Sequence, residues 1–355
     1  MEEQTTMSTR ARGRRLAATA GVLALAVVLS ACRYTGWNDG PAKTAGNDAV
    51  DWIVTQQQND GGFEVAGFPG FETPDAVLAI AEDAQQQWSW SKPQALAAVQ
   101  AVTKNGNDPL DYLDDFAEGG INAGQAAKLI VLVTAPLGLS ATAFDPEGDG
   151  ATNLVAIVDA GAQPNGSYGA FNATLYAAMA KRLVSGSVPA NTLAYIRAAQ
   201  EASGGFDYLG DPNGNDADVD TTAAAIQALA AANVPGTDAD LRDALEFLAY
   251  AQQSNGAWQA FGSDDPNSTA MAMLGITAAG FDPNASCWRD VVAPSLAGDP
   301  YAKPSDWLRT RQLPSGRVQS PNDGFGINTF ATSQAVEAWR RGWIPVTPIA
   351  PQTCP

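Results

Sequence analysis

Residues 220–231 read DTTAAAIQALAA, a small polar start followed by a run that is almost entirely apolar and rich in alanine. Five other segments share this form. They are TPDAVLAIAEDA from Thr73, NAGQAAKLIVLV from Asn122, NATLYAAMAKRL from Asn172, NSTAMAMLGITA from Asn267 and NTFATSQAVEAW from Asn328. Successive segments begin 47 to 50 residues apart, except the last, which begins after 61. A period of this length is typical of helical repeat proteins.

A second kind of helix precedes most of these segments. The clearest examples are DWIVTQQQ from Asp51, LVAIVDAG from Leu154, LAYIRAAQ from Leu193 and LRDALEFLAYAQQ from Leu241. They mix apolar and charged residues, which is typical of a helix with one wet face, whereas the first kind is predicted to be buried. Glycine-aromatic turns join the two kinds. They are Gly62-Phe63, Gly166-Ser167-Tyr168, Gly205-Phe206, Gly256-Ala257-Trp258 and Gly324-Phe325.

Six such helix pairs predict an all-α fold over residues 48–343. We expect an (α/α)6 toroid, a double ring of about twelve helices in which the inner helices are parallel. An open solenoid is the alternative, but its end repeats should carry polar faces, and the first and last buried segments are as apolar as the others. In a closed ring the N-termini of all inner helices gather at one mouth, where each contributes roughly half a positive charge.

The first residue of each buried segment is predicted to cap its helix and to line this mouth. These residues are Thr73, Asn122, Asn172, Asp220, Asn267 and Asn328. Asn122 and Gln125 have the spacing of a capping box. Further candidate ligand contacts are Gln125, Tyr176, Thr221, Thr269 and Gln334. A cup with a polar rim and apolar walls suits a large ligand that is apolar in its body and polar at one end.

Composition excludes several classes of function. The chain has 355 residues and no histidine, so a Ser-His-Asp triad, a Cys-His pair and the usual His-containing zinc sites cannot form. A formal net charge of −18 argues against binding to nucleic acid. No phosphate-cradling glycine motif is present, and no cofactor is expected.

The N-terminal residues predict export. Four arginines precede an apolar run, Leu16 to Leu29, which is too short to span a bilayer and matches a signal-peptide core. The sequence Leu29-Ser30-Ala31-Cys32 resembles a bacterial lipobox. We therefore expect a signal peptide at 1–31, lipidated Cys32, a flexible tether at 32–47, and anchoring through acyl chains to the extracytoplasmic face of the membrane. A secreted protein is the alternative.

Two further features concern the end of the chain and its acidic loops. Cys287 and Cys354 are predicted to form a disulfide that pins the proline-rich tail, 344–355, with free thiols as the alternative. Asp211, Asn213, Asn215 and Asp216 place oxygen atoms on nearby positions, as in calcium loops. The glycine and glutamate of an EF-hand are missing, so a solvated acidic turn is favoured over a metal site.

Two glutamine-rich stretches carry a family resemblance. Residues 56–63, QQQNDGGF, and 252–258, QQSNGAW, are similar to the repeat of protein prenyltransferases and squalene cyclases. Residues 218–230 and 265–283 are similar to helices of secreted bacterial relatives of the cobalamin carriers transcobalamin and intrinsic factor. The whole pattern resembles the α/α toroid shared by these families, which implies that fold and a corrinoid or isoprenoid ligand.

The resemblance also brings attention to Asp218-Val219-Asp220-Thr221. Squalene–hopene cyclases have a DxDD motif that supplies the acid for alkene protonation, and here the third carboxylate is replaced by Thr221. A helix N-terminus favours an ionised Asp, so we interpret Asp220 as a cap rather than an acid.

Three functions follow from this interpretation. The favoured one is a surface lipoprotein that captures a large apolar or amphipathic ligand, a corrinoid, an isoprenoid or another lipid, without chemistry. The first alternative is a cyclase or prenyltransferase-like enzyme that uses Asp218 and Asp220. The second is a scaffold that holds a surface protein on the outside of the ring, and a cavity filled by side chains would favour it.

Overall fold

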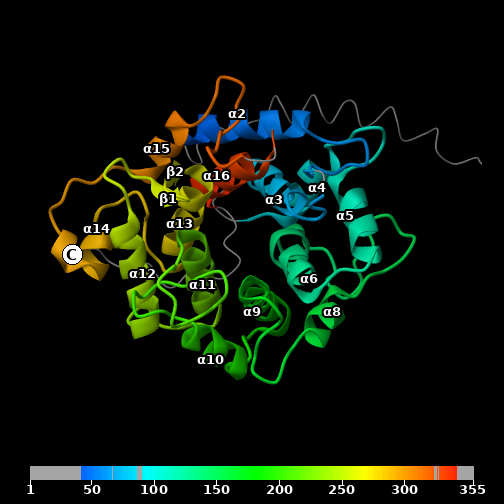
Figure 1. Cartoon of the computed structure of the whole chain (residues 1–355). Coiled ribbons are helices and arrows are strands. Elements are labelled where there is room, and N and C mark those ends of the chain that lie inside the picture. The colour runs from blue at the N-terminus through cyan, green and yellow to red at the C-terminus, as the bar shows by residue number, and fades with distance from the viewer. Residues whose placement is uncertain (1–40, 66, 86–89, 324–325, 327, 342–355) are drawn as a thin grey trace, which may run out of the picture. The chain divides into compact units, whose positions relative to one another are not determined.

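Six buried helical segments form a closed inner ring in the computed structural model (Figure 1). In chain order they are α3 (Thr73–Asp83), α6 (Ala123–Leu129), α9 (Phe171–Ser185), α11 (Val219–Ala231), α13 (Pro266–Ala278) and α16 (Phe330–Arg340). Helix α6 continues through a π-helical turn, η1 (Ile130–Thr134), into α7 (Ala135–Leu137). Each segment packs against the next, and α16 packs against α3. The predicted all-α toroid is therefore confirmed.

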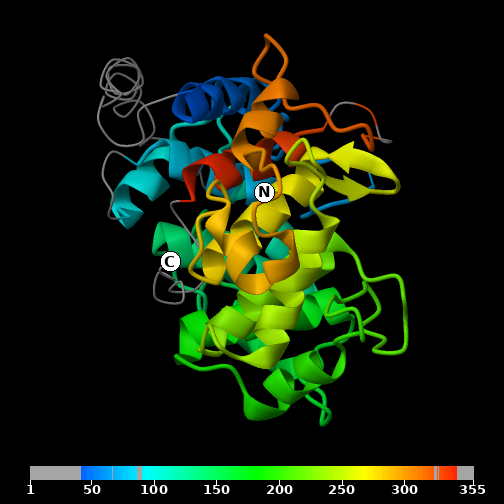
Figure 2. The same cartoon turned by 90° about the vertical axis from the view of Figure 1, so that its left-hand side faces the viewer.

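The outer layer consists of helices that expose one face. They are α2 (Pro41–Thr55), α4 (Lys92–Gln100), α5 (Pro109–Glu118), α8 (Leu154–Ala160), α10 (Ala190–Ala198), α12 (Ala239–Ala251), α14 (Cys287–Val292) and α15 (Pro304–Thr310), with a 3-10 turn, η2 (Pro294–Leu296). Helices α8, α10 and α12 cover α6, α9 and α11. Strands β1 (Trp258–Ala260) and β2 (Ser263–Asp265) form an antiparallel hairpin ahead of α13, coloured yellow in Figure 2.

The structure describes residues 41–65, 67–85, 90–323, 326 and 328–341, which lie in one compact unit, Asn38–Pro355. The predicted signal peptide, Cys32, Cys354 and the tail lie outside these residues, so the lipid anchor and the disulfide stay predictions. Helix α2 begins at Pro41, and residues 41–47 are therefore helical rather than part of a flexible tether. No helix within the described ranges is long and apolar enough to cross a membrane.

The helix starts lie close to the predicted positions, but most of the predicted caps are wrong. Asn122 and Gln125 do form a capping box, because each side chain accepts a hydrogen bond of 3.0 Å from the backbone N–H of the other residue. Asp218 caps α11 and Asp265 caps α13, so Asp220 and Asn267 lie inside their helices.

The other three predicted caps are also wrong. Thr73 and Asn172 lie in the first turn of α3 and α9, and Asn328 precedes the N-cap of α16, Thr329. The N-cap residues of these three helices make no side-chain capping bond. In these repeats a threonine in the first turn of the helix accepts a hydrogen bond from the turn that precedes the helix, and no side chain caps the helix.

A threonine hydroxyl ties this turn to the inner helix in five of the six repeats. The backbone N–H groups of Phe63, Tyr168, Phe206, Trp258 and Val318 donate to the hydroxyls of Thr73, Thr174, Thr222, Thr269 and Thr332 over 2.9–3.0 Å. Thr73 and Thr269 are fully buried as a result. The turn bound by Thr332 in the sixth repeat lies at Gly316–Val318, and the predicted turn at Gly324-Phe325 lies outside the described residues.

A glycine in each of these five turns lies against the backbone of the next repeat. The pairs are Gly61 with Asp108, Gly166 with Asn191, Gly204 with Asp243, Gly256 with Ala302, and Gly316 with Asp48. Gly316 has a φ of +95°, and a β-carbon there would lie 1.9 Å from the carbonyl oxygen of Asp48. Because Asp48 is in α2, this contact joins the sixth repeat to the first.

Polar contacts reinforce the same seam. The Glu72 carboxylate, just before α3, accepts hydrogen bonds of 2.8 Å from both the backbone N–H and the hydroxyl of Thr329. At the other end of α16, the buried Arg340 guanidinium forms an ion pair with Asp83 of α3 and donates to Asn47 of α2. The ring is thus closed by backbone packing and by polar contacts at both ends of α16.

The Gly316 contact predicts a large and specific loss of stability. Gly316→Ala combines a positive φ with a backbone clash, so the free energy of unfolding should fall by about 3 kcal/mol or more. Gly186 is a matched control, since its φ is +78° and no atom lies within 4 Å of the added carbon. Gly186→Ala should cost only about 1 kcal/mol. Urea denaturation of the two variants checks this, and equal losses would show that the seam contact is unimportant.

Candidate functional site

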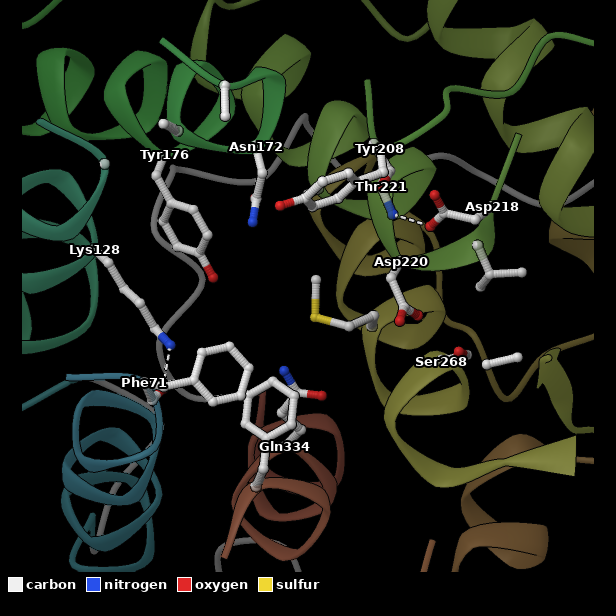
Figure 3. A pocket seen from close by; sticks show the side chains of 18 of the residues that line it. Phe71, Lys128, Asn172, Tyr176, Tyr208, Asp218, Asp220, Thr221, Ser268 and Gln334 are labelled. Atoms are coloured by element: carbon white, nitrogen blue, oxygen red, sulfur yellow. Dashed lines mark hydrogen bonds between the residues drawn. The ribbon is translucent and has the colours of Figure 1, made fainter. Parts of the chain in front are cut away.

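A cavity of about 1590 Å³ opens where the N-termini of the inner helices meet (Figure 3). The first turns of α6, α9, α11, α13 and α16 contribute to its wall, together with residues 67–71 ahead of α3. The inner helices therefore share one direction, as expected. The cavity is larger than most drug-sized ligand sites, which occupy about 300–1,000 Å³.

Seven of the predicted ligand contacts line this cavity. They are Asn122, Gln125, Asn172, Tyr176, Asp220, Thr221 and Gln334. Four do not, because their polar groups are engaged elsewhere. Thr73 and Thr269 bind the turns described above, Asn267 donates to Gln334 over 3.1 Å, and Asn328 donates to Asp323 over 3.2 Å.

Asp218 and Asp220 have different environments although both open α11. The Asp218 carboxylate accepts a hydrogen bond of 2.7 Å from the backbone N–H of Thr221, as an N-cap should. Asp220 lies two residues further, in the first turn of α11, where its carboxyl group forms part of the cavity wall beside Ser268 of α13 (Figure 3). Its Oδ1 atom is buried and accepts no hydrogen bond from any described residue.

The environment of Asp220 disfavours its charged form. Burial raises the pKa of Asp220 from 3.8 to about 7, and repulsion by Asp218 and Asp265 adds to this, while the Ser268 hydroxyl opposes it. Asp265 is itself buried and accepts hydrogen bonds from Ser320 and Asn322 over 2.6 and 2.7 Å. The expectation that the helix N-terminus keeps Asp220 ionised is therefore wrong, and Asp220 can hold a proton near neutral pH.

The wall opposite Asp220 combines aromatic rings with one cation. The rings of Phe71 and Phe330 lie 4.7 Å apart, and the Lys128 ammonium lies 4.9 Å from the centre of the Phe71 ring. Lys128 also forms an ion pair of 2.6 Å with buried Asp75. These aromatic and basic residues are absent from the predicted site. One signal existed, because Lys128 is the only charged residue in the segment NAGQAAKLIVLV.

Buried carboxyl groups continue beneath the cavity. A small space of about 30 Å³ lies below it, bordered by Asp75, Tyr176, Gln334 and Glu337 among others. Burial, with Asp75 and Glu82 nearby, raises the pKa of Glu337 well above its usual value, and burial also raises that of Tyr176. Side chains with raised pKa values therefore lie both in the wall of the cavity, at Asp220, and at its base, at Tyr176 and Glu337.

The predicted calcium residues do not come together. Asp211 is turned into its own loop, where its carboxylate accepts a hydrogen bond of 2.9 Å from the backbone N–H of Asn213. Only Asp216 joins a cluster of potential ligands, and its companions are Glu201 and Asp207 rather than Asn213 and Asn215. The sequence pattern alone could not indicate Glu201, because it follows a different helix, α10, and lies ten residues before Asp211.

No protein-family model and no curated protein matches the chain. The fold is similar to solved structures of low identity. The type II terpene cyclase MstE from Scytonema is 14% identical with a TM-score of 0.58, over 84% of this chain and 97% of the cyclase. A second structure of that cyclase, in complex with geranylgeranyl dihydroxybenzoate as substrate, has the same identity and TM-score, over 85% of this chain and 97% of the other.

Two other structures share this architecture. A protein from Actinoplanes is 16% identical with a TM-score of 0.54, over 85% of this chain and 99% of that one. A glycosidase is 13% identical with a TM-score of 0.50, over 86% and 98% of the two chains. These comparisons show a terpenoid cyclase-like α/α toroid. They do not show the predicted similarity to cobalamin carriers.

The pKa of Asp220 predicts how stability depends on pH. The folded chain, with this pKa near 7, binds more protons than the unfolded chain, in which it is near 3.8. The contribution of Asp220 to the free energy of unfolding therefore falls as the pH rises from about 4 to 7, by as much as about 1 kcal/mol per pH unit. Asp220→Asn removes this dependence.

Urea denaturation of wild type and Asp220→Asn across this pH range measures the difference. The stability of Asp220→Asn relative to wild type should increase with pH, and other buried carboxyl groups cancel because both proteins contain them. Asp159→Asn, which changes an exposed carboxylate paired with Lys181, is the control and should show a nearly constant difference above pH 5. A constant difference for Asp220→Asn would contradict the raised pKa.

Proposed function

We propose that the chain is a terpene cyclase-like enzyme that cyclises a neutral isoprenoid, with Asp220 as the proton donor. The observation that carries this proposal is the carboxyl group of Asp220, with a pKa of about 7, in the wall of a large cavity. An acid for alkene protonation must keep its proton until the substrate arrives, and a desolvated site favours that form. An apolar substrate displaces water from the cavity and so favours the protonated form of Asp220 further.

The remaining lining suits a positively charged intermediate. Proton transfer from Asp220 forms a C–H bond with the electron pair of the alkene and leaves a carbocation, which further double bonds of the chain attack in turn. Aromatic faces stabilise such a cation, and Phe71 and Tyr176 lie across the cavity from Asp220 (Figure 3). Phe330 packs against Phe71, with the ring centres 4.7 Å apart. Loss of a proton from the final cation restores the balance, and the Asp220 carboxylate can accept it.

The charges around the cavity favour a neutral head group over a diphosphate. Lys128 is the only lysine or arginine among the described lining residues, and Asp75 already pairs with it. Asp216 and Asp218 lie in the same wall and repel an anion. The related cyclase structure contains geranylgeranyl dihydroxybenzoate, which likewise carries a long isoprenoid chain. A linear isoprenoid with an uncharged polar end fits these features.

Ligand capture without chemistry is the second candidate. It is favoured by Thr221 in place of the third carboxylate of the cyclase motif and by an open mouth with polar residues such as Asn122 and Asn172. In this form the protein is a lipoprotein, anchored through Cys32 or secreted, that holds a corrinoid, isoprenoid or other lipid. The scaffold hypothesis expects a cavity filled by side chains, and a space of about 1590 Å³ argues against it.

Turnover of defined isoprenoids tests the proposal. Purified protein is incubated with squalene or geranylgeraniol, and gas chromatography with mass spectrometry detects cyclic products of unchanged mass. Asp220→Asn keeps the shape of the side chain but cannot donate the proton, so turnover should fall at least about 100-fold. Asp159→Asn should leave it unchanged. Binding of either compound without conversion, equal in wild type and Asp220→Asn, would support capture instead.

The same acid predicts the pH profile of the reaction. Because the protonated form of Asp220 is the active one, kcat/KM should be level below about pH 7 and fall about tenfold per pH unit above it. Stopped assays from pH 5 to pH 9 measure this profile in wild type. A rate that rises with pH through 7 would identify the catalytic group as a base and exclude this role for Asp220.

A further inference from the structure

Three carboxylates meet beside the mouth of the cavity. Glu201 follows α10, Asp207 lies in the next turn, and Asp216 lies in the loop that leads into α11. One carboxylate oxygen of each residue lies within 4.8 Å of the corresponding oxygens of the other two. No lysine or arginine in the described part of the chain forms an ion pair with any of them. The group carries three negative charges without a protein counter-charge when all three are ionised.

Two of these side chains are buried. Glu201 is 4% exposed and Asp207 is 3% exposed, and the Glu201 Oε1 atom accepts no hydrogen bond from any described group. Burial raises the pKa of Glu201, and the charges of Asp207 and Asp216 raise it further, while hydrogen bonds from the Ser203 hydroxyl, 3.3 Å from Oε2, and from the Asp216 backbone lower it. An unpartnered carboxylate oxygen in such a place costs stability unless something else binds it.

The free oxygen points to the same place as its neighbours. A β-carbon added to Gly214 would lie 2.7 Å from Asp216 Oδ1, 3.0 Å from Glu201 Oε1 and 3.2 Å from the carbonyl oxygen of Asp211. The free oxygen of Glu201 therefore meets oxygen atoms of the 211–216 loop beside Gly214, where a β-carbon would not fit. The buried Oε1 atom of Glu201, which has no hydrogen-bond partner among the described residues and lies close to these oxygens, is a second observation, independent of the number of acidic residues.

We propose that Glu201, Asp207 and Asp216 bind a calcium ion, with the carbonyl oxygen of Asp211 as a further ligand. The ligand set contains only oxygen, which is the preference of a hard cation, and no nitrogen or sulfur donor that zinc or copper favours. Calcium accepts irregular arrangements of carboxylate and carbonyl oxygens, whereas magnesium demands near-ideal octahedral geometry. A divalent ion compensates most of the charge that the three carboxylates bring together.

The position of the site gives the ion a structural role at the cavity. The loop between Asp207 and Asp216 carries Tyr208, which lines the cavity together with Asp216, and it leads directly to Asp218 and Asp220. Binding at both ends of this loop would hold it against α10. It would also reduce the repulsion that Asp207 exerts on Asp218. This role does not depend on whether the cavity performs chemistry.

Hydrogen exchange of residues 207–218 tests the proposal. The purified protein is stripped with EDTA and measured by mass spectrometry with and without 1 mM CaCl2. For a Kd near 10⁻⁴ M, calcium should slow exchange in this segment about tenfold. Glu201→Gln should abolish the effect, and so should Asp216→Asn, whose exposed side chain makes misfolding no concern. An equal concentration of MgCl2 should protect the segment much less.

A second acidic cluster provides the matched control. Asp114, Asp145 and Asp149 form a similar group elsewhere in the ring, and Asp114 is also buried. Asp114→Asn should leave the protection of residues 207–218 unchanged. The proposal is overturned if calcium does not slow exchange there in wild type, or if Glu201→Gln and Asp216→Asn keep the full effect. Because no substrate is added, the outcome is separate from that of the cyclase assay.

Discussion

The fold depends on a steric constraint that recurs between repeats: the backbone of one turn reaches the backbone of the next repeat with no space for a β-carbon. The contact of Gly316 with Asp48 applies this constraint between the last repeat and the first. Similar contacts produce similar rotations between neighbours, so the inner helices keep one direction around the ring. The cavity, and the gathering of helix N-termini around it, are consequences of this closure.

Local sequence could predict the repeat, the burial of the inner helices and the Asn122–Gln125 capping box, because each depends on residues close together in the chain. It could not predict where Thr73 and Thr269 direct their hydroxyls, since a polar residue at the start of each segment fits both a cap and a bond to the preceding turn. The turn at Gly316–Val318 lacks an aromatic residue, so the glycine-aromatic pattern did not predict it. The Lys128, Phe71 and Phe330 group joins three repeats and is visible only after closure.

Asp220 shows how two opposing effects are decided by position. Proximity to a helix N-terminus stabilises a carboxylate by about 0.3–1 kcal/mol at an exposed site. Desolvation of a charge inside a protein costs several kcal/mol. Asp218, at the cap, receives a backbone hydrogen bond, whereas the Oδ1 atom of Asp220 receives none, so desolvation determines its protonation. The sequence places the two residues two positions apart and contains no information on this difference.

The contacts of Arg340 determine at which end of the ring the start of α2 lies. Arg340 lies at the C-terminal end of α16 and donates to the carbonyl oxygen of Lys43, so the start of α2 lies at the end of the ring away from the helix N-termini. Only eight residues, 33–40, separate Cys32 from α2, a reach of at most about 28 Å. Whatever precedes Pro41 therefore joins the ring at the end opposite the entrance, so the start of α2 does not obstruct the path of a ligand into the cavity.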